Sequence, residues 1–130
     1  MPFPLSEDEL KKTENEIGTM LPVSYRESMM EDNGGTVIAK GDTWDIFPVK
    51  NQASRKLISR TSNHIIVETK SAKEWQGFPE NAIAIGGNGC GDFLVLTKDG
   101  NEFSSKVYVW CHENGSLVLV AKDFLELKKA

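Results

Sequence analysis

The glycine-rich segment from Ile85 to Asp92 is the part of the sequence closest to a known type of chemical site. Its run of glycines would suit a backbone that surrounds a phosphate. However, no register fits G-x-G-x-x-G, no Gly-Lys-Ser/Thr follows, and the segment leads into a predicted strand, not a helix N-terminus. A tight turn, or a backbone in close approach to another group, is the better interpretation. We therefore expect no cofactor here, and a positive φ at Gly89 or Gly91.

The cysteines and histidines lack the spacing of a metal site. Cys111 and His112 are adjacent in a predicted strand, where neighbouring side chains point to opposite faces. His64 and Cys90 are distant from them in sequence, and no C-x-x-C or H-E-x-x-H motif occurs. No basic residue flanks Cys90 to favour a reactive thiolate. We expect no bound metal ion, and we interpret Cys90 as an inert small residue.

Two further classes of function lack their usual patterns. Serine, histidine and aspartate are all present, but no G-x-S-x-G or similar elbow supplies an exposed nucleophile. The basic pairs Arg55-Lys56 and Lys128-Lys129 are too short to form the stripe that nucleic-acid binding needs. We therefore expect no catalytic residues, no enzymatic activity and no nucleic-acid partner.

Charge is distributed unevenly along the chain. The formal net charge is −4, and residues 1–45 hold ten acidic and four basic residues, against nine and eleven in residues 46–130. An acidic surface repels nucleic acid and attracts basic partners. A simpler explanation is that the exposed faces of helices carry glutamate, and the sequence leaves both explanations open.

Composition indicates a globular protein. The chain has 130 residues, of which 39% are hydrophobic and 26% charged, so we expect one domain over residues 1–130. Its two cysteines form no disulfide framework, which favours a reducing compartment. The first five residues lack the pattern of a signal peptide and no apolar run approaches a membrane span. A cytoplasmic protein without membrane association is expected.

The first third of the sequence predicts two helices. Residues 6–9 form a capping box for the first helix, and Gly18 ends it. The second helix opens near Pro22, whose missing N–H costs little in a first turn, and an Asn-Gly-Gly sequence stops it. Tyr25 and Met29 are four residues apart on this helix, so we expect both to be buried.

Strands dominate the rest of the chain. Residues 51–75 are ambiguous, because short apolar runs do not separate helix from strand, and helices near 51–61 and 64–75 are the favoured interpretation. Helices that cluster early and strands that cluster late predict an α+β fold. The predicted strands span 36–40 and 44–49 around a turn at Gly41-Asp42, then 82–85, 93–97, 106–111 and 117–120, and Asp123 caps a short last helix.

Several blocks together resemble the SUKH superfamily, of the yeast cell-wall regulator (Smi/Knr) type. The resemblance extends from about Ser6 to Leu127, although residues 51–74 match weakly and Cys90 stands where the family often has glycine. The matching blocks are Leu21-Pro22 with Tyr25, Asn33-Gly34-Gly35, Trp75-Gln76-Gly77-Phe78-Pro79, Ile83-Ala84-Ile85-Gly86, Asn88-Gly89, Gly91-Asp92, Val107-Tyr108-Val109-Trp110 and Phe124.

The resemblance implies a fold and two kinds of function. The fold would be α+β, with a twisted, mostly antiparallel sheet and helices packed mainly on one side. Bacterial members are implied to be immunity proteins that counter toxins, often nucleases, and eukaryotic relatives to be regulatory or scaffold proteins. The expected function is neutralisation of a cognate toxin by direct binding, with a Smi/Knr-type regulatory or scaffold module as the alternative. The expected partner is a protein, and the chain itself is a monomer or weak homodimer.

A partner surface can be proposed from strand alternation in residues 106–112. Val107 and Val109 would face the helices, while large side chains with polar tips share the other face. An alternative is that residues 51–79 cover that second face. The predicted partner-binding residues, with acidic neighbours included for steering, are Asp42, Trp44, Asp45, Tyr108, Trp110, His112 and Glu113.

Overall fold

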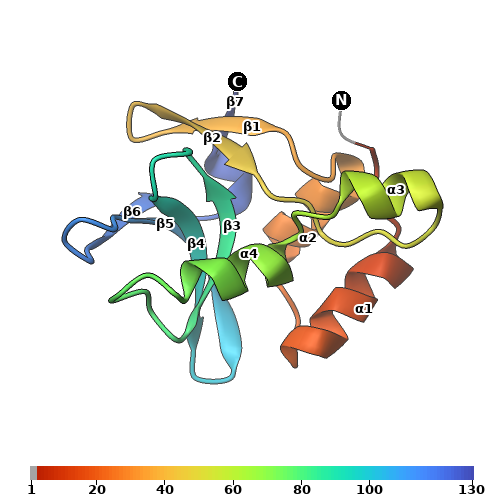
Figure 1. Ribbon diagram of the computed structural model, residues 1–130, viewed down its shortest axis with the longest axis horizontal. Coiled ribbons are helices and arrows are strands. Elements are labelled where there is room, and N and C mark those ends of the chain that lie inside the picture. The colour runs from red at the N-terminus through yellow and green to blue at the C-terminus, as the bar shows by residue number, and fades with distance from the viewer. Residues whose placement is uncertain (1–2) are drawn as a thin grey trace.

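The computed structural model describes residues 3–130 and has the predicted α+β architecture (Figure 1). Two helices come first along the chain, and the strands follow. Two more helices lie in the sequence between the second and third strands. The elements are α1 (Glu7–Ile17), α2 (Val23–Glu31), β1 (Thr36–Ala39), β2 (Asp42–Ile46), α3 (Arg55–Arg60), α4 (Ile65–Ala72), β3 (Ala82–Gly87), β4 (Phe93–Asp99), β5 (Glu102–Trp110), β6 (Leu117–Ala121), the 3₁₀ helix η1 (Phe124–Glu126) and β7 (Lys128–Lys129).

The strands form one antiparallel sheet in the order β6-β5-β4-β3-β2-β1-β7. The ladder between β2 and β3 is short: Asp45 pairs with Gly87 and Ile46 with Gly86, and the Phe47 N–H donates to the Ile85 carbonyl at 2.9 Å. Helix α4 lies beside the rest of β3, where the Thr69 hydroxyl accepts a 2.9 Å hydrogen bond from the Ala84 N–H. A side chain of α4 thus satisfies a backbone N–H of β3 that a neighbouring strand would otherwise pair.

Local signals near the N-terminus act as the sequence predicts. The Ser6 hydroxyl caps α1 at 3.3 Å from the backbone N of Glu9, and Gly18 ends the helix with a φ of 93°. The buried Glu14 then holds α1 to α2, because its carboxylate accepts hydrogen bonds from the Leu21 N–H at 2.7 Å and from Arg26 at 3.0 Å.

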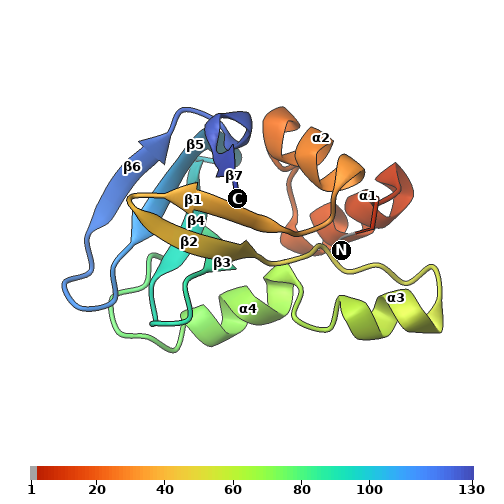
Figure 2. The same ribbon diagram turned by 90° about the horizontal axis from the view of Figure 1, so that it is seen from above.

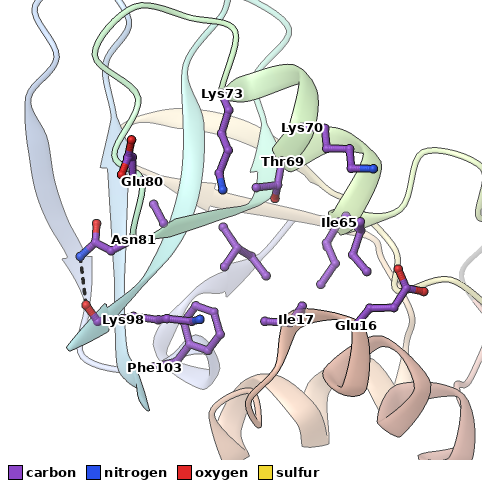
Figure 3. A pocket seen from close by; sticks show the side chains of 13 residues that line it. Glu16, Ile17, Ile65, Thr69, Lys70, Lys73, Glu80, Asn81, Lys98 and Phe103 are labelled. Carbon is purple, nitrogen blue, oxygen red and sulfur yellow. Dashed lines mark hydrogen bonds between the residues drawn. The ribbon is translucent and has the colours of Figure 1, made fainter. Parts of the chain in front are cut away.

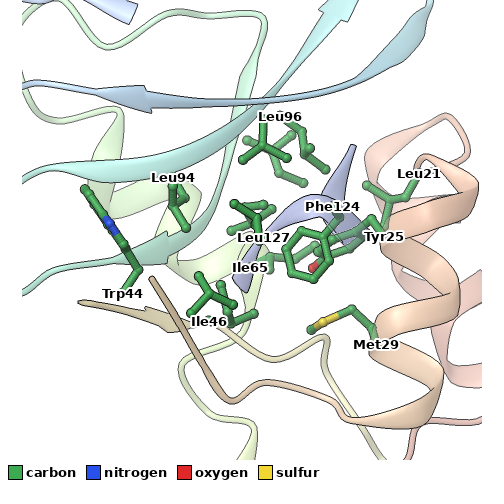
Figure 4. Close-up of a cluster of buried hydrophobic side chains, with 14 of the residues drawn as sticks. Leu21, Tyr25, Met29, Trp44, Ile46, Ile65, Leu94, Leu96, Phe124 and Leu127 are labelled. Carbon is green, nitrogen blue, oxygen red and sulfur yellow. The ribbon is translucent and has the colours of Figure 1, made fainter. Parts of the chain in front are cut away.

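One hydrophobic cluster fills the space between the helices and the inner face of the sheet (Figure 4). Tyr25 and Met29 are both buried in it, which confirms the predicted orientation of α2. The Tyr25 ring packs edge-on against Phe124 of η1, with centroids 5.1 Å apart. The 3₁₀ helix near the C-terminus and the second helix therefore pack together in the same core.

A second, smaller cluster lies on the outer face of the sheet. Residues 72–79, the end of α4 and the segment after it, contribute Ala72 and Phe78 to it. They pack over β4 and β5, where Val95 and Trp110 are buried. Both faces of the sheet therefore bury apolar residues, and α1 and α2 lie together at the end of the molecule opposite to β6 (Figure 2).

Most predicted elements are confirmed, with small corrections. Both helices favoured within residues 51–75 are present as α3 and α4. The first hairpin turns at Lys40-Gly41, both with positive φ, and Asp42 already belongs to β2. β5 begins at Glu102, earlier than predicted, and the two-residue strand β7 was not predicted. No helix within residues 3–130 is long and apolar enough to cross a membrane.

Candidate protein-binding surface

Strand register decides which of the predicted partner-binding residues share a face. Asp45 lies opposite Gly87, Gly87 opposite Phe93, and Phe93 opposite Trp110. Trp110 in turn lies opposite Leu117 of the edge strand β6. Residues opposite one another in a ladder share a face, so this row crosses the outer face from β2 to β6.

Trp44 is not part of this outer face, and its predicted place on a partner surface is wrong. Its side chain is buried in the main core, where the indole N–H donates a 2.9 Å hydrogen bond to the Ala39 carbonyl. Alternation along β2 explains the error, because Trp44 and Ile46 point inward while Asp45 points outward.

Trp110 lies on the predicted face, but it is fully buried there, so its predicted contact with a partner is wrong. The Phe78 ring covers it edge-on with centroids 5.1 Å apart, and the Phe93 ring stacks beside it at 6.3 Å. Its indole N–H has no hydrogen-bond partner within the described chain. Residues 72–79 therefore cover the middle of the outer face, which is the alternative weighed from the sequence.

An exposed apolar area remains beyond this cover. Tyr108 is half-buried, and Leu119, its neighbour across the ladder, is 49% exposed. Leu117, opposite Trp110, is 42% exposed. These three residues on β5 and β6, Tyr108, Leu117 and Leu119, are called the β6 patch below. The sequence analysis missed the two leucines, although their strand has no polar residue on either face.

Strand β6 is also an open sheet edge. Among residues 3–130 it pairs with β5 alone, so no described strand bonds the backbone groups on its other side. The opposite edge, β7, is two exposed lysines long, and short charged edges resist further pairing. The segment Leu117–Ala121 carries no charge. Of the two edges, β6 is the one suited to association.

Loops beside β6 are joined by polar contacts. The Asn88 amide donates a 3.0 Å hydrogen bond to Asp42, which ties the glycine segment to the first hairpin. The Asp92 carboxylate lies 2.6 Å from the ring Nδ1 of His112 and accepts a 3.1 Å bond from its backbone N–H. The half-exposed Trp75 ring packs on His112, with centroids 5.0 Å apart.

These contacts give the glycine segment a structural role. Gly89 and Gly91 have φ values of 80° and 98°, which confirms the predicted positive φ. A Cβ at Gly91 would lie 3.0 Å from the His112 ring, so glycine permits the close approach. Burial of Asp92 disfavours its charged form, but the hydrogen bonds from His112 outweigh this and lower the pKa of Asp92. The carboxylate stays ionised and orients the ring.

The acidic residues fall into two groups. Asp42, Asp45 and Glu113 are exposed on the strands and turns of the β6 end, as the predicted steering residues should be. The glutamates of α1 lie at the opposite end, and two of them form ion pairs with Arg26. The acidic first third of the sequence is therefore not one continuous surface.

One family is identified by comparison with known proteins. The model of the SMI1 / KNR4 family (SUKH-1) matches residues 4–129, from just before α1 to the end of the sheet. No curated protein matches the chain. The match covers the core, the glycine segment and the β6 patch alike.

Proposed function

Because the chain belongs to the SMI1 / KNR4 family (SUKH-1), we propose that it is an immunity protein that neutralises a bacterial toxin by binding it directly. The observation that carries this proposal is the β6 patch, an exposed apolar surface on an unprotected sheet edge. Exposed apolar groups bordered by polar residues are typical of protein–protein contacts. Neutralisation of this kind requires a binding surface and no catalytic group.

The β6 patch supplies the anchors in this proposal. Leu117 and Leu119 would lose their remaining exposure under the partner, and Tyr108 would contribute an apolar ring with a polar tip. Along the open edge, the free backbone groups of β6 would pair with an extended segment of the toxin. His112 and Glu113 lie on the adjoining turn and would form part of the polar rim.

Asp42 and Asp45 would act at longer range. Asp45 stands four strands from Leu117 in the same row, which is about 19 Å at the usual strand spacing. That separation is too long for a shared contact but short enough for electrostatic steering at low salt. A nuclease toxin would present a basic cleft, so these carboxylates would speed its approach.

Co-expression with a toxin encoded beside the gene for this chain tests the proposal. The wild-type chain should restore growth of a bacterial host that expresses the toxin, and it should co-purify with the toxin. The Leu117→Thr/Leu119→Thr variant should lose protection, because threonine suits a strand but removes the apolar anchors. Ile38→Thr is the matched control, since Ile38 is 42% exposed on β1 and lies outside the β6 patch.

Three results would contradict the proposal or its assignment to the β6 patch. Failure of the wild-type chain to protect against any neighbouring toxin would remove the immunity function. A stable complex with a protein that is not a toxin would favour the regulatory or scaffold alternative. Equal protection by the folded double variant and the wild-type chain would separate the function from the β6 patch.

A further inference from the structure

A cavity of about 400 Å³ opens between the end of α1, helix α4 and the strands β3 to β5 (Figure 3). Its floor is apolar and comes from four elements, α1, α4, β3 and β5. The main floor residues are Ile17, Ile65, Ile83 and Phe103. The residues of the β6 patch do not line this cavity, so the two sites are separate.

The hairpin between β4 and β5 forms one wall of the cavity. The Lys98 N–H donates to the Asn81 carbonyl at 2.8 Å, and the Asn81 side-chain amide donates to the Lys98 carbonyl at 3.0 Å. The register of the hairpin then places Lys98 opposite Phe103, with its Nζ 5.6 Å from the ring centroid. This wall is therefore fixed by backbone contacts and presents an ammonium group above an apolar ring.

Hydrogen-bond donors converge on the middle of the cavity. Figure 3 shows Lys73 of the segment after α4 and Lys98 of β4 pointing inward from different sides. Neither lysine forms an ion pair with any residue in the described range 3–130. The Thr69 hydroxyl also points inward, and because it accepts from Ala84 its own proton is free to be donated.

Three further charged residues line the rim. Glu16 and Glu80 are exposed, and Figure 3 shows their carboxylates at the margin, directed away from the middle. Lys70 is likewise directed outward. The centre of the cavity is therefore positive over an apolar floor, although the chain as a whole carries a net charge of −4. Such a site favours an anion with an apolar body.

We propose that this cavity binds a small organic anion, a carboxylate with a medium-length apolar chain. The carboxylate would lie between Lys73 and Lys98 and accept a hydrogen bond from Thr69, and the chain would rest on Ile83 and Phe103. The cavity volume falls within the range of small-molecule sites. Both the carboxylate and the apolar chain of the ligand are needed for binding. Water could hydrate the lysines in place of a carboxylate alone, and the apolar floor would bind a neutral chain as well as a charged one.

Titration with octanoate, followed by ¹⁵N-resolved NMR, tests the proposal. Amide shifts should saturate at Ile65, Ile83, Lys98 and Phe103. Octanol, which lacks the charge, and acetate, which lacks the chain, should each bind at least about tenfold more weakly. A response to octanol equal to that to octanoate would overturn the selection of an anion.

Two lysine variants locate the binding. Lys73→Met keeps the length and apolar stem of an exposed side chain, so the fold should survive, and affinity for octanoate should fall about tenfold. Lys106→Met, on β5 and outside the cavity, should leave affinity unchanged. Saturable shifts away from the cavity, no saturation at all, or equal affinity in Lys73→Met and the wild-type chain would each contradict the proposal.

Discussion

Glu9 and Glu14 show how a single acidic residue can serve the fold instead of a partner. Both are buried on α1. The Glu9 carboxylate accepts a 2.9 Å hydrogen bond from the Gln52 N–H, so it ties α1 to the loop before α3. Glu14 similarly ties α1 to α2 through Leu21 and Arg26. The sequence could not separate these structural carboxylates from the exposed ones that are accessible to a partner.

Replacing Glu14 should be costly. Glu14→Ala leaves the buried Leu21 N–H without its acceptor and the nearly buried Arg26 guanidinium with the more exposed Glu7 alone, which should lower the free energy of unfolding by about 3 kcal/mol. Glu16→Ala, at an exposed position of the same helix, should change it by less than about 0.5 kcal/mol. Urea unfolding measures both values, and similar losses in the two variants would contradict the role of Glu14.

His64 makes part of the stability depend on pH. Its Nδ1 accepts from the Val67 N–H at 3.4 Å and so caps α4, which a protonated ring cannot do. Burial, with help from the positive charges of Lys50 and Lys70, lowers the pKa of His64, and Glu16 only partly opposes this. The unfolded chain therefore takes up the proton first as pH falls below about 6.5, so acidification through that range destabilises the fold.

The variant His64→Asn should remove this part of the pH dependence. Asparagine can still cap the helix but does not titrate. The wild-type chain should lose more unfolding free energy than His64→Asn when the pH is lowered from 8 to 5.5, since the other titrating groups are common to both. Chemical denaturation at the two pH values measures the difference, and identical losses would show that His64 does not contribute.

At the scale of elements, the glycine segment offers a matched pair of positions. Gly89 and Gly91 both have positive φ, but a Cβ at Gly89 would meet open space while one at Gly91 would meet the His112 ring at 3.0 Å. Gly89→Ala should cost about 1 kcal/mol from backbone strain alone. Gly91→Ala should cost more, because His112 must also move and loosen its bond to Asp92.

A double-mutant cycle isolates the cost of the contact between the new Cβ at Gly91 and the His112 ring. In a His112→Ala background, the excess cost of Gly91→Ala over Gly89→Ala should largely disappear, because the ring that obstructs the Cβ has gone. Thermal unfolding of the variants supplies the comparison. An excess that persists without the ring would place the constraint in the backbone and not in the contact with His112.

Strand β6 shows what a sequence pattern can and cannot say about an element. Its short apolar run after a turn sequence predicts a strand, and the structure has β6 at Leu117–Ala121, against the predicted 117–120. Pattern alone does not say that the strand is an edge, because that depends on which other strands pair with it. The exposure of Leu117 and Leu119 follows from the sheet order, and so the β6 patch became visible only in three dimensions.

For the whole molecule, local sequence signals predicted the helices and strands well, whereas non-local packing determines which side chains on the outer face are buried. Caps, turns and alternation located most helices and strands, and the family resemblance supplied their arrangement. The burial of Trp110 depends on residues 72–79, more than thirty positions earlier in the chain, and no local pattern reports that contact. Alternation along the strand predicts which face of the sheet carries Trp110, but only the tertiary structure shows that this face is covered at Trp110.

The separation of charge across the molecule leads to a kinetic prediction. The triple variant Asp42→Asn/Asp45→Asn/Glu113→Gln should slow association with the toxin and reduce its dependence on salt, while dissociation should change little. The three residues are exposed, so the fold should be unaffected. Stopped-flow mixing at two salt concentrations measures the rates. An unchanged association rate at low salt would show that these carboxylates do not steer the partner.

Hydrogen exchange of the backbone amides, with and without the bound toxin, tests the proposed partner surface most directly. Binding at the β6 patch predicts that exchange slows in Leu117–Ala121, including amides on the open side of the edge, while Lys128–Lys129 at the other edge keeps its rate. Unchanged exchange throughout β6, with protection confined to α1 and α2 at the opposite end of the molecule, would contradict it.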